Sequence, residues 1–433
     1  MNSSFVSSAV STWVTQLAVA VLSLANVLVV ARELGASGRG EVAFLTTVAY
    51  LSSQLALLGV EQANVNFAAA DPGLRRALAT NSVVLAVLLG AVAVAVVSVL
   101  VAVFPDAGGP TSAALRWLVL GAIPMLILQV YLLLLVRADY AFGLANLAYL
   151  LGPVVNVTVN GLLAALGVLS VGTAVSTWIG GQTLAAVVLA WYVARRSAGF
   201  GRPDARLARR TLRFGVKAHA GRAMLLGNYR LDQWILGAIA GARELGLYSV
   251  AVAWAEALFY LPTALAAVQR PYLVRSGSSS AARDASLVFR AAMLATVPLV
   301  VVLLVAAPFL CVTVFGSEFR GSIEQLRILA VGAFGIVALK LLGNALTARG
   351  RPLLETAAVG VAFLVTVALD VALIPGHGGV GASIASTIAY SAGGVAVVAI
   401  FTRALGCRLR DLVPSRRETT ALVASALRRP AAP

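Results

Sequence analysis

Long uninterrupted apolar runs fill most of this chain and limit what it can fold into. A membrane-spanning helix needs about 20 consecutive apolar residues, and such runs recur from near the N-terminus to residue 401. Apolar residues make up 60% of the 433 residues and charged residues only 12%, whereas soluble proteins average about 45–50% and about 25%. The lipid bilayer is therefore the expected solvent, and no room remains for a sizeable soluble domain.

Twelve apolar runs bounded by charged residues, glycine or proline are expected to be transmembrane helices. They are Ala9–Ala31, Val42–Phe67, Ala79–Phe104, Trp117–Val136, Phe142–Leu166, Thr173–Val193, Phe214–Ala240, Ser249–Leu273, Val288–Phe315, Ile328–Ala348, Leu353–Ile374 and Val380–Phe401. Strands of a membrane barrel would instead be alternating segments of about ten residues. The sequence thus predicts an all-α integral membrane protein of about 12 transmembrane helices, the first of them uncleaved.

The distribution of Lys and Arg predicts the orientation in the membrane. If both termini are cytoplasmic, most cations fall in cytoplasmic segments, as the positive-inside rule requires. The outer segments then hold only Arg32, Arg39, Arg116, Arg243, Arg320 and Arg327. Orientation in a bacterial cell membrane accounts for the net charge of +16, and nucleic acid is not an expected partner.

A basic segment divides the chain into two halves. We expect an N-terminal six-helix bundle in 1–194, a basic cytoplasmic linker in 195–213, a C-terminal six-helix bundle in 214–404 and a basic cytoplasmic tail in 405–433. The first turn of each half shares a pattern of Gly, four residues and Gly, at Gly35–Gly40 and Gly241–Gly246. Glycine pairs are common in turns, but duplicated halves are usual in transporters.

Motifs for catalysis or metal binding are missing from the sequence. It has no zinc-ligand spacing, P-loop or GxSxG motif, and Cys311 and Cys407 form neither a disulfide framework nor a metal pattern. We therefore expect a transporter rather than an enzyme, with no cofactor, metal or catalytic residue. Its energy would come from an ion gradient, the membrane potential or the substrate gradient.

Ionisable residues inside the apolar runs are the candidate functional residues, because a charge at the centre of a membrane helix costs roughly 2.5–3.5 kcal/mol. The seventh run is richest in them. With about 3.6 residues per turn, one face of this helix presents His219, Arg222, Tyr229, Arg230 and Gln233. Asp232 lies to one side of that face.

We interpret this face, together with Lys340 in the tenth run, as the lining of a cationic cavity for an anionic substrate. The planar fork of Arg binds two phosphate oxygens at once. In the alternative interpretation, Arg222 reaches back to the membrane interface and Arg230 pairs with an acid on a neighbouring helix. The candidates for ion coupling or charge pairing are Glu61, Asp232, Glu256 and Asp370.

Two segments resemble bacterial polysaccharide flippases of the multidrug/oligosaccharidyl-lipid/polysaccharide exporter superfamily. Residues 31–41, AREL-GASGRGE, resemble the first outer turn of these proteins. Leu231-Asp232 through Leu236-Gly237, followed by Gly246-Leu247-Tyr248 and Ala251, resemble their seventh and eighth helices. The order of spans and the basic linker agree over the whole chain.

This resemblance implies a V-shaped, MATE-like pair of six-helix bundles that works by alternating access. It implies a flippase that moves an undecaprenyl-diphosphate-linked oligosaccharide from the inner to the outer leaflet for cell-surface polysaccharide biosynthesis. The diphosphate would cross a cationic cavity while the lipid tail stays in the bilayer. Implied partners are this lipid-linked glycan, membrane lipids and other polysaccharide assembly proteins. Peptidoglycan-precursor flippases of the superfamily typically have fourteen helices, so this chain departs from that branch.

Two other functions stay open at this point. A multidrug or organic-cation antiporter coupled to H⁺ or Na⁺ would also have twelve helices, and the four acids named above would bind its coupling ion. A membrane enzyme acting on polyprenyl-linked sugars would usually carry a large outer loop. The longest outer segments, around Pro105–Arg116 and Gly316–Arg327, are short.

Overall fold

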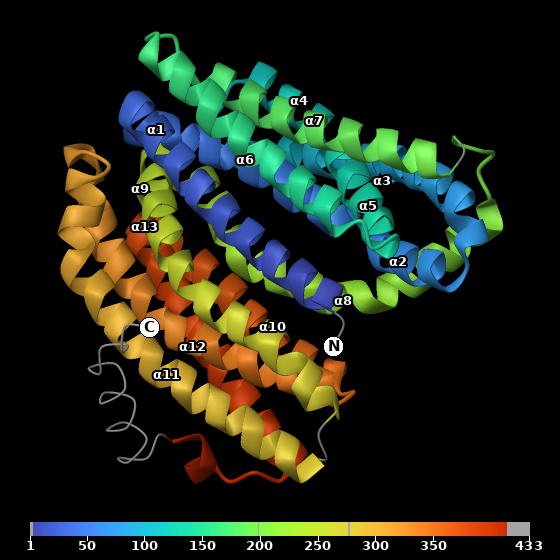
Figure 1. The fold of residues 1–433 in the computed structure, drawn as a ribbon. Helices are drawn as coiled ribbons and strands as arrows, with labels where there is room; N and C mark the ends of the chain where they lie inside the picture. Colours follow the sequence, from blue (N-terminus) through green and yellow to red (C-terminus); the bar gives the residue numbers. More distant parts are fainter. Residues whose placement is uncertain (1–2, 198, 276–277, 414–433) are drawn as a thin grey trace, which may run out of the picture.

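The computed structural model describes residues 3–197, 199–275 and 278–413. Over these ranges the chain forms thirteen α-helices joined by short turns, without a β-strand (Figure 1). The predicted all-α class is therefore confirmed. Residues 414–433, which make up most of the predicted basic tail, lie outside the described ranges.

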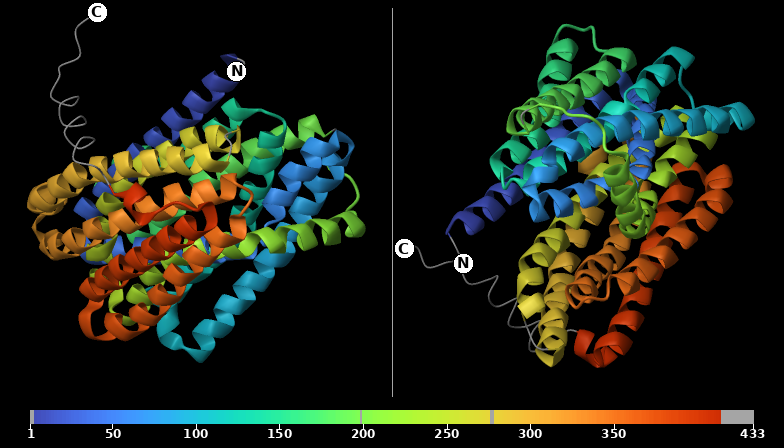
Figure 2. Two further views of the ribbon diagram at one scale, coloured as in Figure 1. Left: turned by 90° about the horizontal axis from the view of Figure 1, so that it is seen from below. Right: turned by 90° about the vertical axis from the view of Figure 1, so that its right-hand side faces the viewer.

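Seven helices form an N-terminal lobe, coloured blue to green in Figures 1 and 2. They are α1 (Ser3–Ala56), α2 (Val60–Ala70), α3 (Arg75–Val103), α4 (Ala113–Gly121), α5 (Ile123–Ala138), α6 (Phe142–Ala165) and α7 (Val171–Arg196). Two 3₁₀ turns, η1 (Pro72–Leu74) and η2 (Pro105–Gly108), flank α3.

The other helices form most of a C-terminal lobe, coloured yellow-green to red. They are α8 (Ala205–Ile239), α9 (Gly241–Ala255), α10 (Tyr260–Arg275), α11 (Ser278–Pro308), α12 (Ser322–Ala348) and α13 (Pro352–Leu405). The short turns in this half are η3 (Glu256–Phe259), η4 (Phe309–Thr313), η5 (Ser317–Gly321) and η6 (Leu409–Leu412). Because α8 begins at Ala205, it includes much of the predicted linker.

Nine helical stretches in the described part of the chain are long and apolar enough to cross a membrane. Two of them, α1 and α13, extend over more than one predicted apolar run. Helix α13 contains the last two runs, whereas α1 contains the first run and ends inside the second, which continues as α2. Each bends at a glycine with positive φ, 64° at Gly35 and 51° at Gly378, a conformation that glycine adopts without steric cost. Helix α8 contains all but the last residue of the seventh predicted run, but it is rich in Arg and is not among these nine stretches. The chain is therefore a multi-pass membrane protein.

The two lobes touch most closely where the bend of α1 meets the start of α9. A methyl group on Gly40 would overlap the carbonyl oxygen of Ala242, and one on Gly246 would overlap that of Ala36. Each glycine thus lies against the residue that follows the first glycine of the other half's motif. The two Gly–four–Gly turns, far apart in the sequence, form one reciprocal contact.

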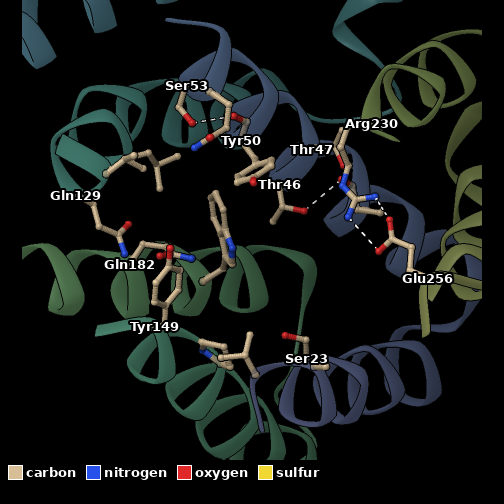
Figure 3. Close-up of a pocket in the computed structure, with 18 of the residues that line it drawn as sticks. Ser23, Thr46, Thr47, Tyr50, Ser53, Gln129, Tyr149, Gln182, Arg230 and Glu256 are labelled. Carbon is tan, nitrogen blue, oxygen red and sulfur yellow. Dashed lines mark hydrogen bonds and ion pairs between the residues drawn. The ribbon is translucent and has the colours of Figure 1, made fainter. Parts of the chain in front are cut away.

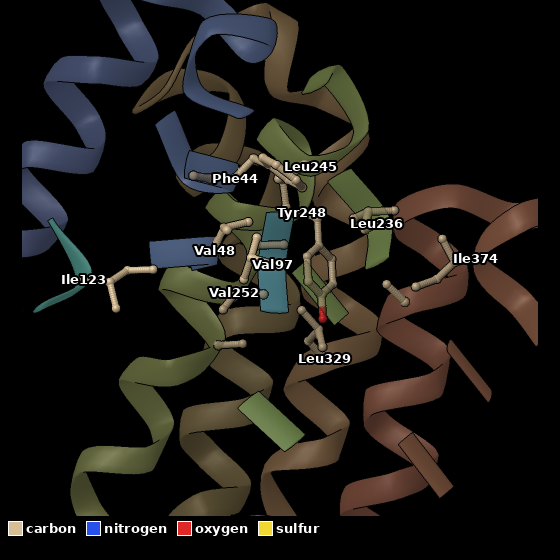
Figure 4. Packing of buried hydrophobic residues seen from close by; sticks show 14 of the residues in the cluster. Phe44, Val48, Val97, Ile123, Leu236, Leu245, Tyr248, Val252, Leu329 and Ile374 are labelled. Atoms are coloured by element: carbon tan, nitrogen blue, oxygen red, sulfur yellow. The ribbon is translucent and has the colours of Figure 1, made fainter. Parts of the chain in front are cut away.

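A buried apolar cluster joins both lobes beside this contact (Figure 4). Phe44 and Val48 of α1 pack there with Leu236 of α8 and with Leu245 and Tyr248 of α9. Where water rather than lipid would otherwise cover these side chains, burying them stabilises the contact by about 25 cal/mol per Å² of apolar surface. The lobes are therefore closed at this end of the molecule.

Helix α8 is shared by the lobes. It packs against α9 and α13 in the C-terminal lobe and against α1 and α2 in the N-terminal lobe. Gly215 of α8 and Gly59, the residue before α2, approach so closely that a methyl group on either would overlap the other's backbone. The polar face of α8 is thereby placed between the lobes.

Candidate functional site

A cavity of about 710 Å³ lies between the lobes, with α8 along one side (Figure 3). The N-terminal lobe contributes residues of α1, α2, α5, α6 and α7 to its lining, and the other side comes from α8, α9, η3 and α10. Its volume is within the range of about 300–1,000 Å³ that is usual for small-ligand sites. The charged residues that line it are Arg39, Arg137, Arg222, Arg230 and Glu256.

Arg230 forms a two-pronged ion pair with Glu256. Its Nη1 lies 2.6 Å from Oε1 of Glu256 and its Nη2 lies 3.2 Å from Oε2 (Figure 3). Pro262 has no N–H to donate to the carbonyl of Leu258, and the helix is a 3₁₀ turn over Glu256–Phe259. Glu256 is the first residue of this turn, and its carboxylate neutralises Arg230 in the cavity wall.

Arg222 binds side chains on both sides of the break between α1 and α2. Its Nη1 lies 3.2 Å from Oε1 of Glu61, and its Nη2 lies 3.3 Å from Oε1 of Gln54. Glu61 is fully buried in the first turn of α2, where the partial positive charge of a helix N-terminus favours a carboxylate.

The helix break itself is supported by two side chains. Tyr131 of α5 donates to the carbonyl of Leu57 at 2.9 Å, and Nε2 of His219 lies 3.0 Å from the carbonyl oxygen of Leu55. Carbonyls freed by a break in a membrane helix must find such partners. His219 therefore meets the helix backbone and is not part of the cavity lining.

Arg39 and Arg137 line the cavity without a carboxylate partner among the described residues. Arg39 is at the closed end beside Gly40, and its Nε is buried without a hydrogen bond there. Arg137 is in the last turn of α5, and its guanidinium lies 5.1 Å from the ring centre of Tyr149. These two arginines carry the positive charge that the Glu61 and Glu256 pairs leave uncompensated.

A second set of acids is buried in the C-terminal lobe, away from the cavity. Asp232 accepts hydrogen bonds from the hydroxyls of Tyr248 at 2.5 Å and Ser386 at 3.3 Å. Asp370 is fully buried, and neither of its carboxylate oxygens has a hydrogen-bond partner in the described part of the chain.

Helix geometry brings these two acids to the same level. One turn before them, Thr366 of α13 donates to the side-chain oxygen of Asn228 of α8. Residues four apart lie one turn apart on the same face of a helix. Asp232 is four residues after Asn228 in α8, and Asp370 is four residues after Thr366 in α13, so each acid lies one turn beyond this hydrogen bond. A buried carboxylate without a donor is costly unless it is protonated or binds a cation.

The remaining predicted residues are placed as follows. Gln233 lines the cavity, where its side-chain oxygen accepts a hydrogen bond from Thr47 at 3.1 Å. Tyr229 lies outside it, 6.0 Å from Phe259 between ring centres. Lys340 is also outside, with its Nζ 5.9 Å from the ring centre of Tyr229. The structure thus brings Arg222, Arg230, Gln233 and Glu256 to one cavity, and His219, Tyr229 and Lys340 are not part of its lining.

The sequence interpretation missed Arg39 and Arg137 because it placed both in loops. The helices extend past the apolar runs by enough to carry each arginine into the cavity wall. An available signal was the position of Arg39 one residue before the second glycine of the turn motif. For Arg137 the sequence offers only its place at the end of an apolar run.

Residues 29–324 match the family model described as polysaccharide biosynthesis protein, which covers more than half of the chain. A search of curated proteins finds no match.

Several solved transporters share the fold. The lipid II flippase MurJ in an inward closed conformation has a TM-score of 0.67 and 11% identity, over 93% of this chain and 88% of MurJ. An inward-facing multidrug resistance MATE family transporter of the MOP superfamily has a TM-score of 0.67 and 15% identity, over 96% and 99%. A MOP superfamily transporter from Pyrococcus furiosus has a TM-score of 0.65 and 14% identity, over 93% and 95%. The predicted MATE-like fold is confirmed.

Proposed function

Because the chain belongs to the polysaccharide biosynthesis protein family, we propose that it is a flippase for a lipid-linked oligosaccharide carried on undecaprenyl diphosphate. The observation that carries this proposal is the charge of the cavity. Four arginines line it against one carboxylate, that of Glu256. A diphosphate with several charged oxygens fits such a site, because hydrogen bonds between guanidinium and phosphate are short and strong.

The membrane orientation predicted from the Lys and Arg residues determines which side of the membrane the cavity faces. With cytoplasmic termini, the contact of Gly40 with Ala242 and of Gly246 with Ala36 lies at the outer side. The structure is then the inward-facing state, in which the diphosphate enters from the inner leaflet. Opening of the outer contact would release it on the other side.

Deletion of the encoding gene tests this function directly. We expect the deletion strain to accumulate a finished glycan on undecaprenyl diphosphate, measured by mass spectrometry of extracted lipids, and to keep its normal drug susceptibility. Re-expression should remove the accumulated lipid. An unchanged lipid pool with heightened drug sensitivity would contradict the flippase and favour the multidrug antiporter. That alternative requires an organic cation to enter a cavity with four arginines, which is electrostatically unfavourable.

We further propose that Asp370 and Asp232 couple transport to a cation, H⁺ or Na⁺. They are buried in the lobe opposite the N-terminal cavity wall, and Asp370 lacks any donor among the described residues. Asp370→Asn should keep the shape of the side chain but remove the charge that binds the ion. We expect export to fall by about 5- to 150-fold, as complete loss of a coupling of about 1–3 kcal/mol implies.

The measurement is glycan-lipid accumulation in a strain that expresses only the variant. Ser391→Ala is a control on the same helix, because Ser391 is exposed and, within the described residues, its hydroxyl bonds only the carbonyl of Thr387 in its own helix. Full export by Asp370→Asn would rule out the coupling role for this residue.

A further inference from the structure

The cavity wall of the N-terminal lobe differs in chemistry from the α8 side. It carries side-chain amides and aromatic rings, at Tyr50, Gln62, Gln129, Tyr149, Trp178 and Gln182. In Figure 3, Gln129, Gln182 and Tyr149 lie together on the side of the cavity opposite Arg230 and Glu256. Arg39 of α1 and Arg137 of α5 also belong to this wall, and the guanidinium of Arg137 lies 5.1 Å from the ring centre of Tyr149. The cavity therefore has the Arg230–Glu256 ion pair on one side and uncharged amides and rings beside an arginine on the other.

The amides of Gln129 and Gln182 are uncommitted. Neither side chain makes a hydrogen bond within the described ranges, although both are half-buried on α5 and α7. By contrast, Gln54 accepts from Arg222 and Gln233 accepts from Thr47. Polar residues that hold membrane helices together do so by hydrogen bonds across the helices, so that role does not explain Gln129 and Gln182.

A carboxamide presents a carbonyl acceptor and two N–H donors on one plane. Neighbouring hydroxyl groups of a sugar need the same combination of acceptor and donor. An aromatic ring beside them offers a flat apolar surface on which the C–H face of a sugar ring can rest. Trp178 of α7 lines the cavity four residues before Gln182, and residues four apart share a helix face.

We propose that Gln129 and Gln182 bind the hydroxyl groups of the sugar that is attached directly to the diphosphate, while the arginines hold the diphosphate. This inference rests on the proposed flippase function and adds the glycan subsite. A cavity of about 710 Å³ holds only the part of an oligosaccharide nearest the lipid carrier. Gln129 and Gln182 therefore determine specificity for the first sugar and do not read the rest of the glycan.

The test compares two lipids that differ only by the sugar. Purified protein is titrated with undecaprenyl diphosphate and with the glycan-linked lipid extracted from the deletion strain, and bound lipid is measured by native mass spectrometry. We expect the wild type to bind the glycan-linked lipid more tightly. The double variant Gln129→Leu, Gln182→Leu should lose roughly tenfold in affinity for that lipid, the effect of two neutral hydrogen bonds, and none for undecaprenyl diphosphate.

Two matched variants separate the sugar subsite from other effects. Gln16→Leu changes an exposed amide of α1 outside the cavity lining and should alter neither affinity. Arg39→Gln should weaken both lipids equally, because both carry the diphosphate. Single variants at Gln129 and at Gln182, each expected to lose about threefold, guard against misfolding of the double variant.

Other results would contradict either the sugar subsite or the proposed flippase function. Equal loss of both lipids by the double variant, or loss of neither, would overturn the sugar subsite. Equal affinity of the wild type for the two lipids would also overturn it while leaving the flippase function intact. If the wild type bound neither lipid, the proposed function itself would fail.

Discussion

Replacing Arg230 with glutamine should abolish glycan export while the protein still inserts and folds. The guanidinium lines the cavity and would meet the diphosphate there. Its removal also leaves Glu256 as an unpaired anion facing an anionic substrate. The two side chains are 27% and 31% exposed, so water screens the stranded Glu256, and the main loss comes from the missing guanidinium fork that would bind the phosphate oxygens. Arg222→Gln, which strands the buried Glu61 in the same way, should give the same loss.

A double variant separates binding from pairing. If Arg230 serves only to neutralise Glu256, then Arg230→Gln combined with Glu256→Gln restores a neutral wall and restores export. If Arg230 binds the diphosphate, the double variant stays inactive. Glycan-lipid accumulation in the deletion strain is the readout, and amount and melting temperature of the purified protein report folding.

Arg209→Gln provides the control on the same helix. Arg209 is exposed on α8 and absent from the cavity lining, so export should be normal. Normal export by Arg230→Gln itself would refute the role assigned to that residue.

The sequence predicted the cationic face of α8 but could not decide between its two interpretations. Helical periodicity places Arg222 and Arg230 on one face whatever packs against it. The structure shows that the two interpretations are compatible for Arg230, which both lines the cavity and pairs with Glu256 from a neighbouring helix. That partner depends on the 3₁₀ turn before Pro262, a tertiary detail that a hydropathy pattern does not contain.

Helix breaks show the same limit. The run Val42–Phe67 reads as one continuous helix, yet the chain breaks at Leu58 and Gly59, both with positive φ. Apolar composition does not predict such a break, because one continuous helix and two shorter helices of the same residues are equally apolar. The close approach of Gly215 to Gly59 shows what fixes it, a contact between residues more than 150 positions apart. Composition therefore predicted the all-α membrane class but not the break that positions Glu61.

The second large effect is expected at the contact that closes the lobes. Gly246→Ala should shift the protein away from the closed state, because its methyl group would overlap the carbonyl of Ala36. In an ordinary helix position, Gly→Ala stabilises a protein by roughly 0.4–1 kcal/mol. Overpacking instead costs about 1–3 kcal/mol, which changes a conformational ratio by about 5- to 150-fold.

Accessibility of the cavity reports this shift. A cysteine introduced at Thr46, which lines the cavity, should resist a membrane-impermeant thiol reagent added outside cells when Gly246 is present. The same cysteine should react in the Gly246→Ala background, and export should fall in parallel. Gly40→Ala, the reciprocal change, should reproduce both effects.

Gly180→Ala is the matched control, because a methyl group at this helical position meets no atom within 4 Å. It should change neither labelling nor export. If Gly246→Ala also left both unchanged, the lobes would not need to separate at this contact during transport. The reciprocal Gly–four–Gly turns would then serve only to pack the two halves together. If labelling rises while export falls, these two turns close the outer side of the cavity in each transport cycle. This closure would explain why both halves carry the Gly–four–Gly motif.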